Sequence, residues 1–355
     1  MVDQGGIVQR GTKPRGTGQG GRWSLVAMLI LGVAVTVLVP LYAPYHIVLQ
    51  ITLYLSFGML ALSLAFIWGY GGIFSFGQAA FFGLGGYTYA IAAINMGDST
   101  VPILLAIAIP TVFALILGYF MFYGRLSSVY VAVITLVVTL LIHKFMGHTA
   151  GMEYVIGTAQ LGGYNGIPGV PPINQPGDPS KFLWPEDVFY VACAGLFGTY
   201  FLLRWVLRTR FGRIIVGIRE NELRVELLGF DVRFYKMMAF TLAAAIAAVA
   251  GIIFTNWNAF IDPHVFDLGT SAQIIIWVVV GGLGTLVGPI LGAIALSWLT
   301  LELGTQQDFD VNLILGAIFA LFVLVVPQGL IPSLRNLIDR WRRRDDVPAK
   351  AATHG

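Results

Sequence analysis

The residues of this sequence best suited to polar chemistry are gathered in one short charged segment. Nine acidic and basic side chains lie between Arg213 and Lys236, although only 11% of the 355 residues are charged. The spacing predicts a short helix over Arg219–Leu228, with charges on one side and leucines on the other. The leucines are Leu223, Leu227 and Leu228. Gly229 follows, where a helix ends and a positive φ is often needed. These charges form no acid–base or metal-binding constellation.

The pattern of this charged segment has two interpretations. An amphipathic helix beside a membrane span commonly lies on the inner leaflet of the bilayer, with its apolar side in the lipid. The same helix, held between two apolar segments, would also serve as a docking site through which another protein moves this one. Spacing alone does not decide between the two.

Composition places the chain in a membrane. Its hydrophobic fraction is 57% and its mean hydropathy is +0.80, whereas soluble domains carry about 25% charged residues. No charged residue occurs in 23–97, 237–261 or 311–334, and about 20 apolar residues cross a bilayer core. These runs are continuous and do not alternate, which favours helices over a barrel. We therefore predict an all-α, polytopic membrane helical bundle.

About ten transmembrane helices can be placed in this bundle, and the two near residues 74 and 268 have the weakest patterns. The ten cover residues 23–43, 47–68, 74–95, 101–124, 129–146, 187–207, 234–256, 268–283, 285–303 and 311–327. With both termini in the cytoplasm, 19 of the 21 Lys and Arg residues fall on the cytoplasmic side, as the positive-inside rule requires. The basic segments indicate contact with inner-leaflet lipid and not with nucleic acid.

The chain divides into three predicted regions. Residues 1–22 are expected to form a disordered cytoplasmic tail, 23–332 the transmembrane domain and 333–355 a basic cytoplasmic tail. The longest outer loop, 147–186, is rich in Gly and Pro. Long loops without a helical pattern are usually functional or disordered, and the prolines favour a fixed, extended path that could meet an external partner.

A second polar signal lies in an uncharged stretch interrupted by glycine. Gly69 and Gly72 break the apolar run, and broken helices at membrane depth are tolerated where they line a cavity. Ser75 and Gln78 follow, and burying either without a partner would cost about 1–3 kcal/mol. The candidates for lining a translocation pathway are Ser75, Gly77, Gln78 and Phe81. Close helix packing through glycine, and hydrogen bonds between helices, explain the same residues equally well.

A third signal is the glycine cluster within residues 276–295. Gly281, Gly282 and Gly284 form another helix break between short apolar pieces. This break would pack against the charged segment if both lay on the cytoplasmic side. A tight turn between two spans is the simpler interpretation.

These stretches, in this order, resemble the branched-chain amino acid permease family (the LivM type) of ABC transporters. The family pattern G-R-x-x-x-A-I-R-E-N-E-x-x-A-x-x-x-G is matched from Gly212 to Gly229, with Gly217 and Val225 in place of the usual Ala. The patterns G-x-x-G-x-x-S-x-G-Q-x-x-F and G-G-x-G-[ST]-x-x-G-P are matched from Gly69 and from Gly281. The resemblance covers most of residues 50–332, and it specifies the family better than the substrate.

The resemblance implies a permease subunit of an ABC importer for branched-chain amino acids, in the inner membrane of a prokaryote. Its partners would be a second homologous permease, two ABC ATPases and an extracytoplasmic substrate-binding protein. ATP and Mg would be bound by the ATPases, because this sequence has no G-x-x-x-x-G-K-[ST] stretch; no enzyme activity, metal or cofactor is expected in this chain. We call residues 208–233 the coupling segment, since the resemblance implies that it transmits ATPase motion. The implied coupling residues are Arg213, Arg219, Glu220, Asn221, Glu222, Glu226 and Gly229.

Two other functions stay open on the sequence. Trp277 is a feature that the urea branch of this family often shares, which would make urea or short-chain amides the substrate. An ion-coupled secondary carrier belongs to another class, and it would be expected to carry at least one carboxylate inside the membrane. The sequence places no Asp or Glu well inside a predicted span, which favours an external source of energy.

Overall fold

The computed structural model describes residues 32–175, 178–304 and 316. The chain divides into two units, Met1–Pro44 and Tyr45–Gly355. An apolar helix covers Gly32–Tyr42 in the first unit. The described part of the second unit consists of helices, together with three pairs of short strands. A mostly helical fold is therefore confirmed.

The second unit begins with α2 (Tyr45–Leu64), which continues into a π-helical turn, η1 (Ala65–Tyr70). The remaining helices are α3 (Gln78–Met96), α4 (Thr100–Tyr123), α5 (Ser128–Gly147), α6 (Pro185–Arg208), α7 (Arg210–Glu220), α8 (Glu222–Leu227), α9 (Val232–Asn258), α10 (Leu268–Gly281) and α11 (Val287–Gly304). Among the described residues, six segments are long and apolar enough to cross a membrane: Tyr45–Tyr70, Thr100–Tyr123, Ser128–Gly147, Glu186–Arg208, Val232–Asn258 and Val287–Gly304.

Ten transmembrane helices are not confirmed by this structure. The segments with the weakest patterns form α3 and α10, and neither is among the six candidate spans. Helix α10 has 14 residues, which at about 1.5 Å per residue fall short of a bilayer core about 30 Å thick. Of 23–43, the described part is helical over Gly32–Tyr42. The tenth predicted span (311–327) and both terminal tails lie outside the described residues, apart from Gly316.

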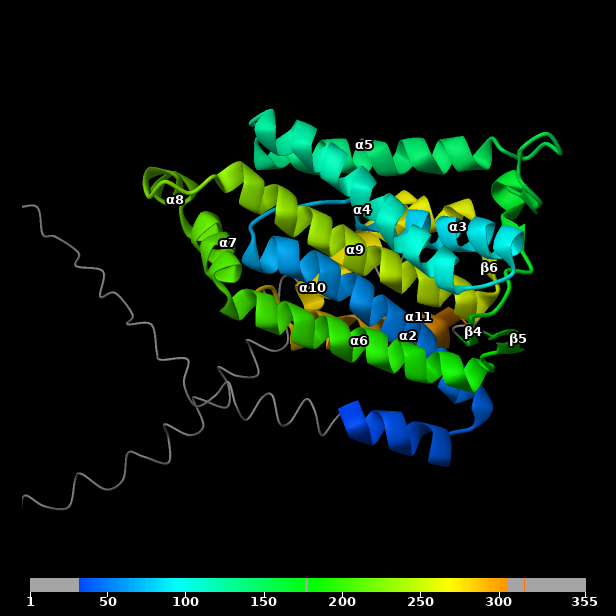
Figure 1. The fold of residues 1–355 in the computed structure, drawn as a ribbon. Coiled ribbons are helices and arrows are strands. Elements are labelled where there is room, and N and C mark those ends of the chain that lie inside the picture. The colour runs from blue at the N-terminus through cyan, green and yellow to red at the C-terminus, as the bar shows by residue number, and fades with distance from the viewer. Residues whose placement is uncertain (1–31, 176–177, 305–315, 317–355) are drawn as a thin grey trace, which may run out of the picture. The chain divides into compact units, whose positions relative to one another are not determined.

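Helix α9 is the centre of the second unit, where it packs against α2, α3, α4 and α6 (Figure 1). Its contact with α3 is too close for larger side chains. A Cβ on Gly251 would lie 1.9 Å from the backbone oxygen of Phe82, and one on Gly85 would lie 2.6 Å from that of Ala248. Small residues therefore let the two backbones touch, as in other membrane helix pairs.

The outer loop predicted at 147–186 follows a path of short strands and turns. β1 (Val155–Ile156) pairs with β2 (Ala159–Gln160), and β4 (Asn174–Gln175) pairs with β5 (Asp178–Phe182). β3 (Ile167–Pro168) pairs with β6 (Phe260–Ile261), which follows α9. The 3-10 turns are η2 (Gly163–Asn165) and η3 (Pro263–Phe266). In Figure 1, β4, β5 and β6 lie at the end of the second unit opposite to α7 and α8.

Candidate functional site

The coupling segment contains two helices, so the prediction of one helix over Arg219–Leu228 is wrong. Helix α7 ends at Glu220 and α8 starts at Glu222, because Asn221 is extended, with φ −161° and ψ 99°. Its side-chain oxygen accepts a hydrogen bond from the backbone N of Arg224 at 2.9 Å. Asn is among the best residues for capping a helix N-terminus in this way. Asn221 is a residue type that favours such a cap, but its neighbours favour a continuous helix, so the sequence pattern did not predict the interruption.

The leucines of α8 and of its C-cap do not pack on the described part of the bundle. The side chains of Leu223, Leu227 and Leu228 are 64%, 79% and 70% exposed, whereas Val225 is buried at 8%. Val225 lies against α7, where a Cβ on Gly217 would be 3.2 Å from it. Gly229, with φ +87°, follows the C-cap of α8. The sequence-predicted apolar side therefore exists, and it faces away from the described residues of this chain.

Charged side chains fix α8 to the start of α9. Lys236 Nζ donates to Glu222 Oε2 at 2.5 Å, and Asp231 accepts from the backbone N of Arg233 at 3.1 Å to cap α9. Arg213 Nη1 donates to the backbone oxygen of Arg208 at 3.2 Å, within the turn that joins α6 to α7. A partly exposed ion pair contributes about 0–1 kcal/mol, so the Lys236–Glu222 pair orients α8 more than it stabilises the fold.

A cleft of about 720 Å³ lies beside α8. One wall is the turn between α4 and α5, which carries Arg125. The other wall is formed by α8 with Glu226, the turn that follows it, and the start of α9 with Arg233. Tyr123 OH donates to Asp231 Oδ2 at 3.3 Å and joins the two walls. The cleft presents both signs of charge next to the exposed leucines, as expected of a protein-binding surface.

The predicted helix breaks at residues 69–72 and 281–284 lie at helix ends and touch one another. We call them the first and the second glycine break. Gly69 belongs to η1, Gly72 follows it with φ +69°, and Gly284 follows α10 with φ +81°. A Cβ on Gly69 would lie 2.9 Å from the backbone N of Gly284. Gly281 is the last residue of α10, and Gly282 caps it.

Arg219 joins the coupling segment to this pair of breaks. Its Nη1 donates a hydrogen bond to the backbone oxygen of Gly69. A Cβ on Gly72 would lie 3.2 Å from Arg219 Cγ, and one on Gly284 would lie 3.8 Å from Arg219 Nη1. The second break is thus a turn between α10 and α11, and it also lies against the coupling segment. Its predicted position on the cytoplasmic side stays a prediction.

The four residues proposed to line a pathway are buried. Gln78 is 1% exposed, and its Oε1 accepts a hydrogen bond from Ser63 Oγ at 3.0 Å. Ser75 is fully buried and accepts from the backbone N of Gly77 at 3.0 Å. Phe81 packs edge-to-face on Phe240, with ring centroids 5.3 Å apart. The Ser63–Gln78 bond is the helix-to-helix contact that the sequence left open, and the lining role stays a prediction.

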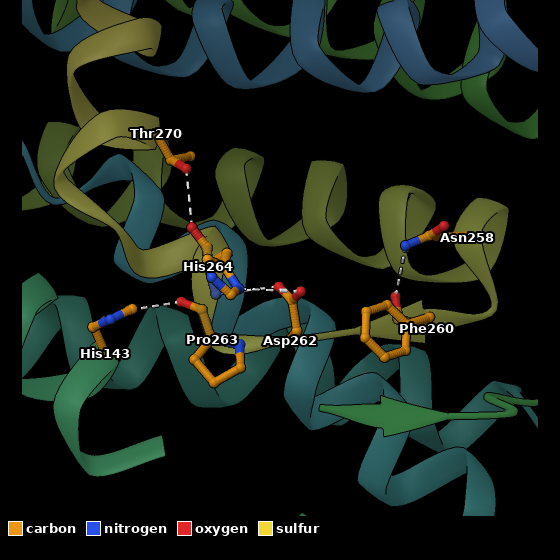
Figure 2. Close-up of polar contacts among 7 residues, drawn as sticks. All are labelled: His143, Asn258, Phe260, Asp262, Pro263, His264 and Thr270. Carbon is orange, nitrogen blue, oxygen red and sulfur yellow. Dashed lines mark hydrogen bonds and ion pairs between the residues drawn. The ribbon is translucent and has the colours of Figure 1, made fainter. Parts of the chain in front are cut away.

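At the opposite end, polar contacts secure the segment that follows α9 (Figure 2). His143 Nδ1 lies 2.9 Å from the backbone oxygen of Pro263, and Thr270 Oγ1 donates to that of His264 at 3.0 Å. His264 Nδ1 is 3.3 Å from Asp262 Oδ2. The ring centroids of His143 and His264 are 6.5 Å apart. The described residues contain no group of three His, Cys, Asp or Glu that could hold a metal ion.

Comparison with known proteins decides the family. The model of the permease component of branched-chain amino acid transport systems matches residues 46–326. The chain belongs to this family. The matched range includes both glycine breaks, the coupling segment and the outer loop of this permease. No solved structure matches the chain.

Relatives of this permease carry related names. The high-affinity branched-chain amino acid transport system permease protein LivM of Escherichia coli K12 is 29% identical over 88% of this chain and 75% of its own length. The probable branched-chain amino acid transport permease protein LivM of Methanocaldococcus jannaschii is 24% identical over 78% of this chain and 90% of its own length. The autoinducer 2 import system permease protein LsrC of Salmonella choleraesuis is 36% identical, but over only 26% of this chain and 28% of its own length.

Proposed function

We propose that this chain is the membrane subunit of an importer that carries branched-chain, hydrophobic amino acids and is driven by ATP hydrolysis in partner subunits. The single observation that carries the ATP-driven part is the exposed apolar side of α8. Two leucines on this helix of six residues, Leu223 and Leu227, and the C-cap residue Leu228 remain uncovered, while the neighbouring Val225 is buried. A partner that buries such a surface gains roughly 25 cal/mol per Å² of apolar area removed from water.

A partner ATPase fits this surface better than lipid does. Helix α8 has only six residues and begins after the N-cap Asn221, whereas helices that lie in a membrane surface are commonly much longer. Exposed charges flank the leucines, and the cleft with Arg125 and Glu226 lies beside them. A protein surface can pair such charges at the rim of an apolar contact. In this proposal α7 and α8 face the cytoplasm, and so do both termini.

The other partners follow from the same assignment. A second, homologous permease would form the pathway together with this chain, and two ATPases would bind ATP and Mg. An extracytoplasmic substrate-binding protein would dock at the opposite end, where the outer loop and β6 are hydrogen-bonded together. Lipid would cover the exposed apolar faces of helices such as α4 and α5. No role in binding nucleic acid is proposed.

The proposed substrate is a zwitterion with an apolar side chain. In the six candidate spans, charged residues lie only within the first or last two turns. An uncharged pathway favours a solute without net charge, because a fixed charge inside the membrane is expensive and would bind one end of the zwitterion too tightly. Ser75, Gly77, Gln78 and Phe81 remain the proposed pathway residues, and they would reach the solute only after a rearrangement that exposes them.

Uptake in cells tests this function. Labelled leucine is supplied to cells that lack this chain and to the same cells with the chain restored, before and after ATP depletion. We expect restored, ATP-dependent uptake that valine and isoleucine compete for and that urea does not. Competition by urea alone would move the substrate to the amide class. Uptake that survives ATP depletion would contradict the importer and favour an ion-coupled carrier.

A further inference from the structure

One arginine connects the coupling segment with both glycine breaks. Arg219 donates to the backbone oxygen of Gly69 and lies against Gly72 in the first break. Its guanidinium is also next to Gly284 in the second break. The two breaks touch each other at Gly69 and Gly284. A displacement of Arg219 therefore reaches the ends of α2 and α10 together.

Helix α7 holds this arginine firmly against the bundle. Ile215 and Ile218 on the same helix are 0% and 3% exposed, and a Cβ on Gly71 would lie 3.5 Å from Ile215. Arg219 is in the last turn of α7, and the extended Asn221 separates it from α8. Along the backbone, two residues separate Arg219 from the start of α8, and Val225 of α8 also lies against Gly217 of α7.

The accepting carbonyl explains why an arginine suits this position. Carbonyl groups in the last turn of a helix lack partners within the helix and need donors from elsewhere. A guanidinium offers several donors in a fixed plane, and its hydrogen bonds to carbonyl oxygen are charge-assisted. A lysine would offer one compact charge on a flexible stem. It could reach the carbonyl of Gly69 but would not lie across both breaks.

We infer that Arg219 is a positioning residue that transmits displacement of α8 to the two glycine breaks, and that it acts inward and not as a contact for the ATPase. This inference rests on the proposed function, in which an ATPase binds α8. It assigns separate tasks to neighbouring residues. The exposed leucines bind the partner, Asn221 forms the joint, and Arg219 carries the motion to the ends of α2 and α10.

Arg219→Ala and Arg219→Lys test the inference in the complete complex, reconstituted in liposomes with its ATPases, second permease and binding protein. Arg210→Ala is the matched control, because Arg210 is an exposed arginine in the first turn of the same helix, α7, nine residues before Arg219. The readouts are the ATPase that co-purifies and the leucine transported per ATP hydrolysed. For Arg219→Ala we expect co-purification within twofold of the wild type and at least a tenfold fall in leucine per ATP. Arg219→Lys should be intermediate, and the control unchanged.

A second measurement follows the breaks directly. Leu283 is 38% exposed in the second break, and the single cysteine of the chain, Cys193, is buried. Maleimide labelling of Leu283→Cys should change in rate when ATP is added. In Leu283→Cys with Arg219→Ala, we expect the ATP-dependent change to disappear. This readout does not depend on transport, and it separates a transmission defect from a general loss of fold.

If Arg219→Ala loses the ATPase as fully as a variant with a charged residue at Leu227, Arg219 is a docking contact and the inference is wrong. Wild-type leucine per ATP in Arg219→Ala would overturn it as well. If Arg219→Ala fails to assemble, Gly72→Ala is used, since its new Cβ would lie 3.2 Å from Arg219 Cγ and require a small shift of that side chain. Partial uncoupling is expected, and full coupling contradicts the inference. A wild-type complex without leucine transport would instead refute the proposed function.

Discussion

Asn221 Oδ1 accepts a hydrogen bond from the backbone N of Arg224 at 2.9 Å, and this bond divides the coupling segment into two helices. Without it, the neighbouring residues favour one continuous helix. The division turns α8 away from α7 and leaves its leucines uncovered. The surface proposed for the ATPase therefore depends on one amide side chain.

Asn221→Ala should weaken this joint. Loss of an N-cap costs about 1 kcal/mol, which is roughly a fivefold shift toward arrangements in which α8 is frayed or continuous with α7. We expect less co-purifying ATPase and slower leucine uptake, with the permease still inserted at its normal level. Asn221→Asp keeps the capping oxygen and is the matched control. Equal loss in both variants would show that the cap is not what matters.

Leu227→Asp with Leu223→Asp should remove the ATPase from purified complexes. Both side chains are mostly exposed in this chain, so the permease itself should keep its expression level and its melting temperature within a few degrees. Val225→Asp is the contrasting variant, because it places a charge at a buried position and should lower the amount of folded permease. Retention of the ATPase by the double variant would favour the lipid interpretation of α8.

Reversal of charge at Glu220 and Glu222 should uncouple ATP hydrolysis from uptake. Glu222→Arg faces Lys236 at the site of the present ion pair, so attraction becomes repulsion and α8 is pushed from the start of α9. The Glu222 side chain is 54% exposed and that of Lys236 is 18% exposed, so loss of the pair costs on the order of 1 kcal/mol, and the protein should stay inserted. ATP hydrolysis and leucine uptake are measured on the same liposomes. Unchanged uptake would contradict a coupling role for these residues.

Gln78→Leu tests the pathway assignment. The single hydroxyl proton of Ser63 also lies within reach of the backbone oxygen of Leu60, 2.6 Å from Oγ, so Ser63 can donate there when Gln78 is removed. We therefore expect little change in the melting temperature, and a change in leucine uptake of severalfold if Gln78 meets the solute. Ser63→Ala is the control for the helix-to-helix bond. A lower protein level with an unchanged rate per molecule would assign Gln78 to packing.

Gly251→Ala should destabilise the contact between α3 and α9. The new Cβ would lie 1.9 Å from the backbone oxygen of Phe82, so the helices must separate, at a cost of about 1–3 kcal/mol for overpacking. Gly198→Ala is the matched control in α6, because nothing lies within 4 Å of its added Cβ. Thermal unfolding in detergent measures both. Equal melting temperatures would mean that the two helices are less closely packed than described.

Much of the fold follows from the sequence because hydropathy specifies long helices directly. The predicted ranges 47–68 and 234–256 agree with helices α2 and α9 to within a few residues, apart from the charged first turn of α9 and the π-helical end of α2. The range 268–283 also forms a helix, but its 14 residues are too few for a span. Hydropathy records apolar character, and it says nothing of where a turn shortens the helix.

The candidate site was only partly predictable. The sequence identifies Gly69, Gly72 and Gly284 as helix breaks, because they interrupt apolar runs. It does not predict the contact between the two breaks, because that contact joins residues far apart in the chain. The sequence did not predict that the Arg219 side chain points toward the bundle, because its neighbours Glu220 and Glu222 follow the pattern of a solvent-facing side. Burial of Gln78 was equally hidden, since one glutamine in an apolar run suits a lined cavity and a packed helix pair alike.

Reconstitution tests the central claim most directly. The complete complex is placed in liposomes with ATP available only to the side that carries α7 and α8, and with the binding protein and labelled leucine on the other side. We expect leucine to accumulate against its gradient when ATP and binding protein are both present. No accumulation is expected when either ATP or the binding protein is left out. Accumulation driven by an ion gradient without ATP would contradict the account.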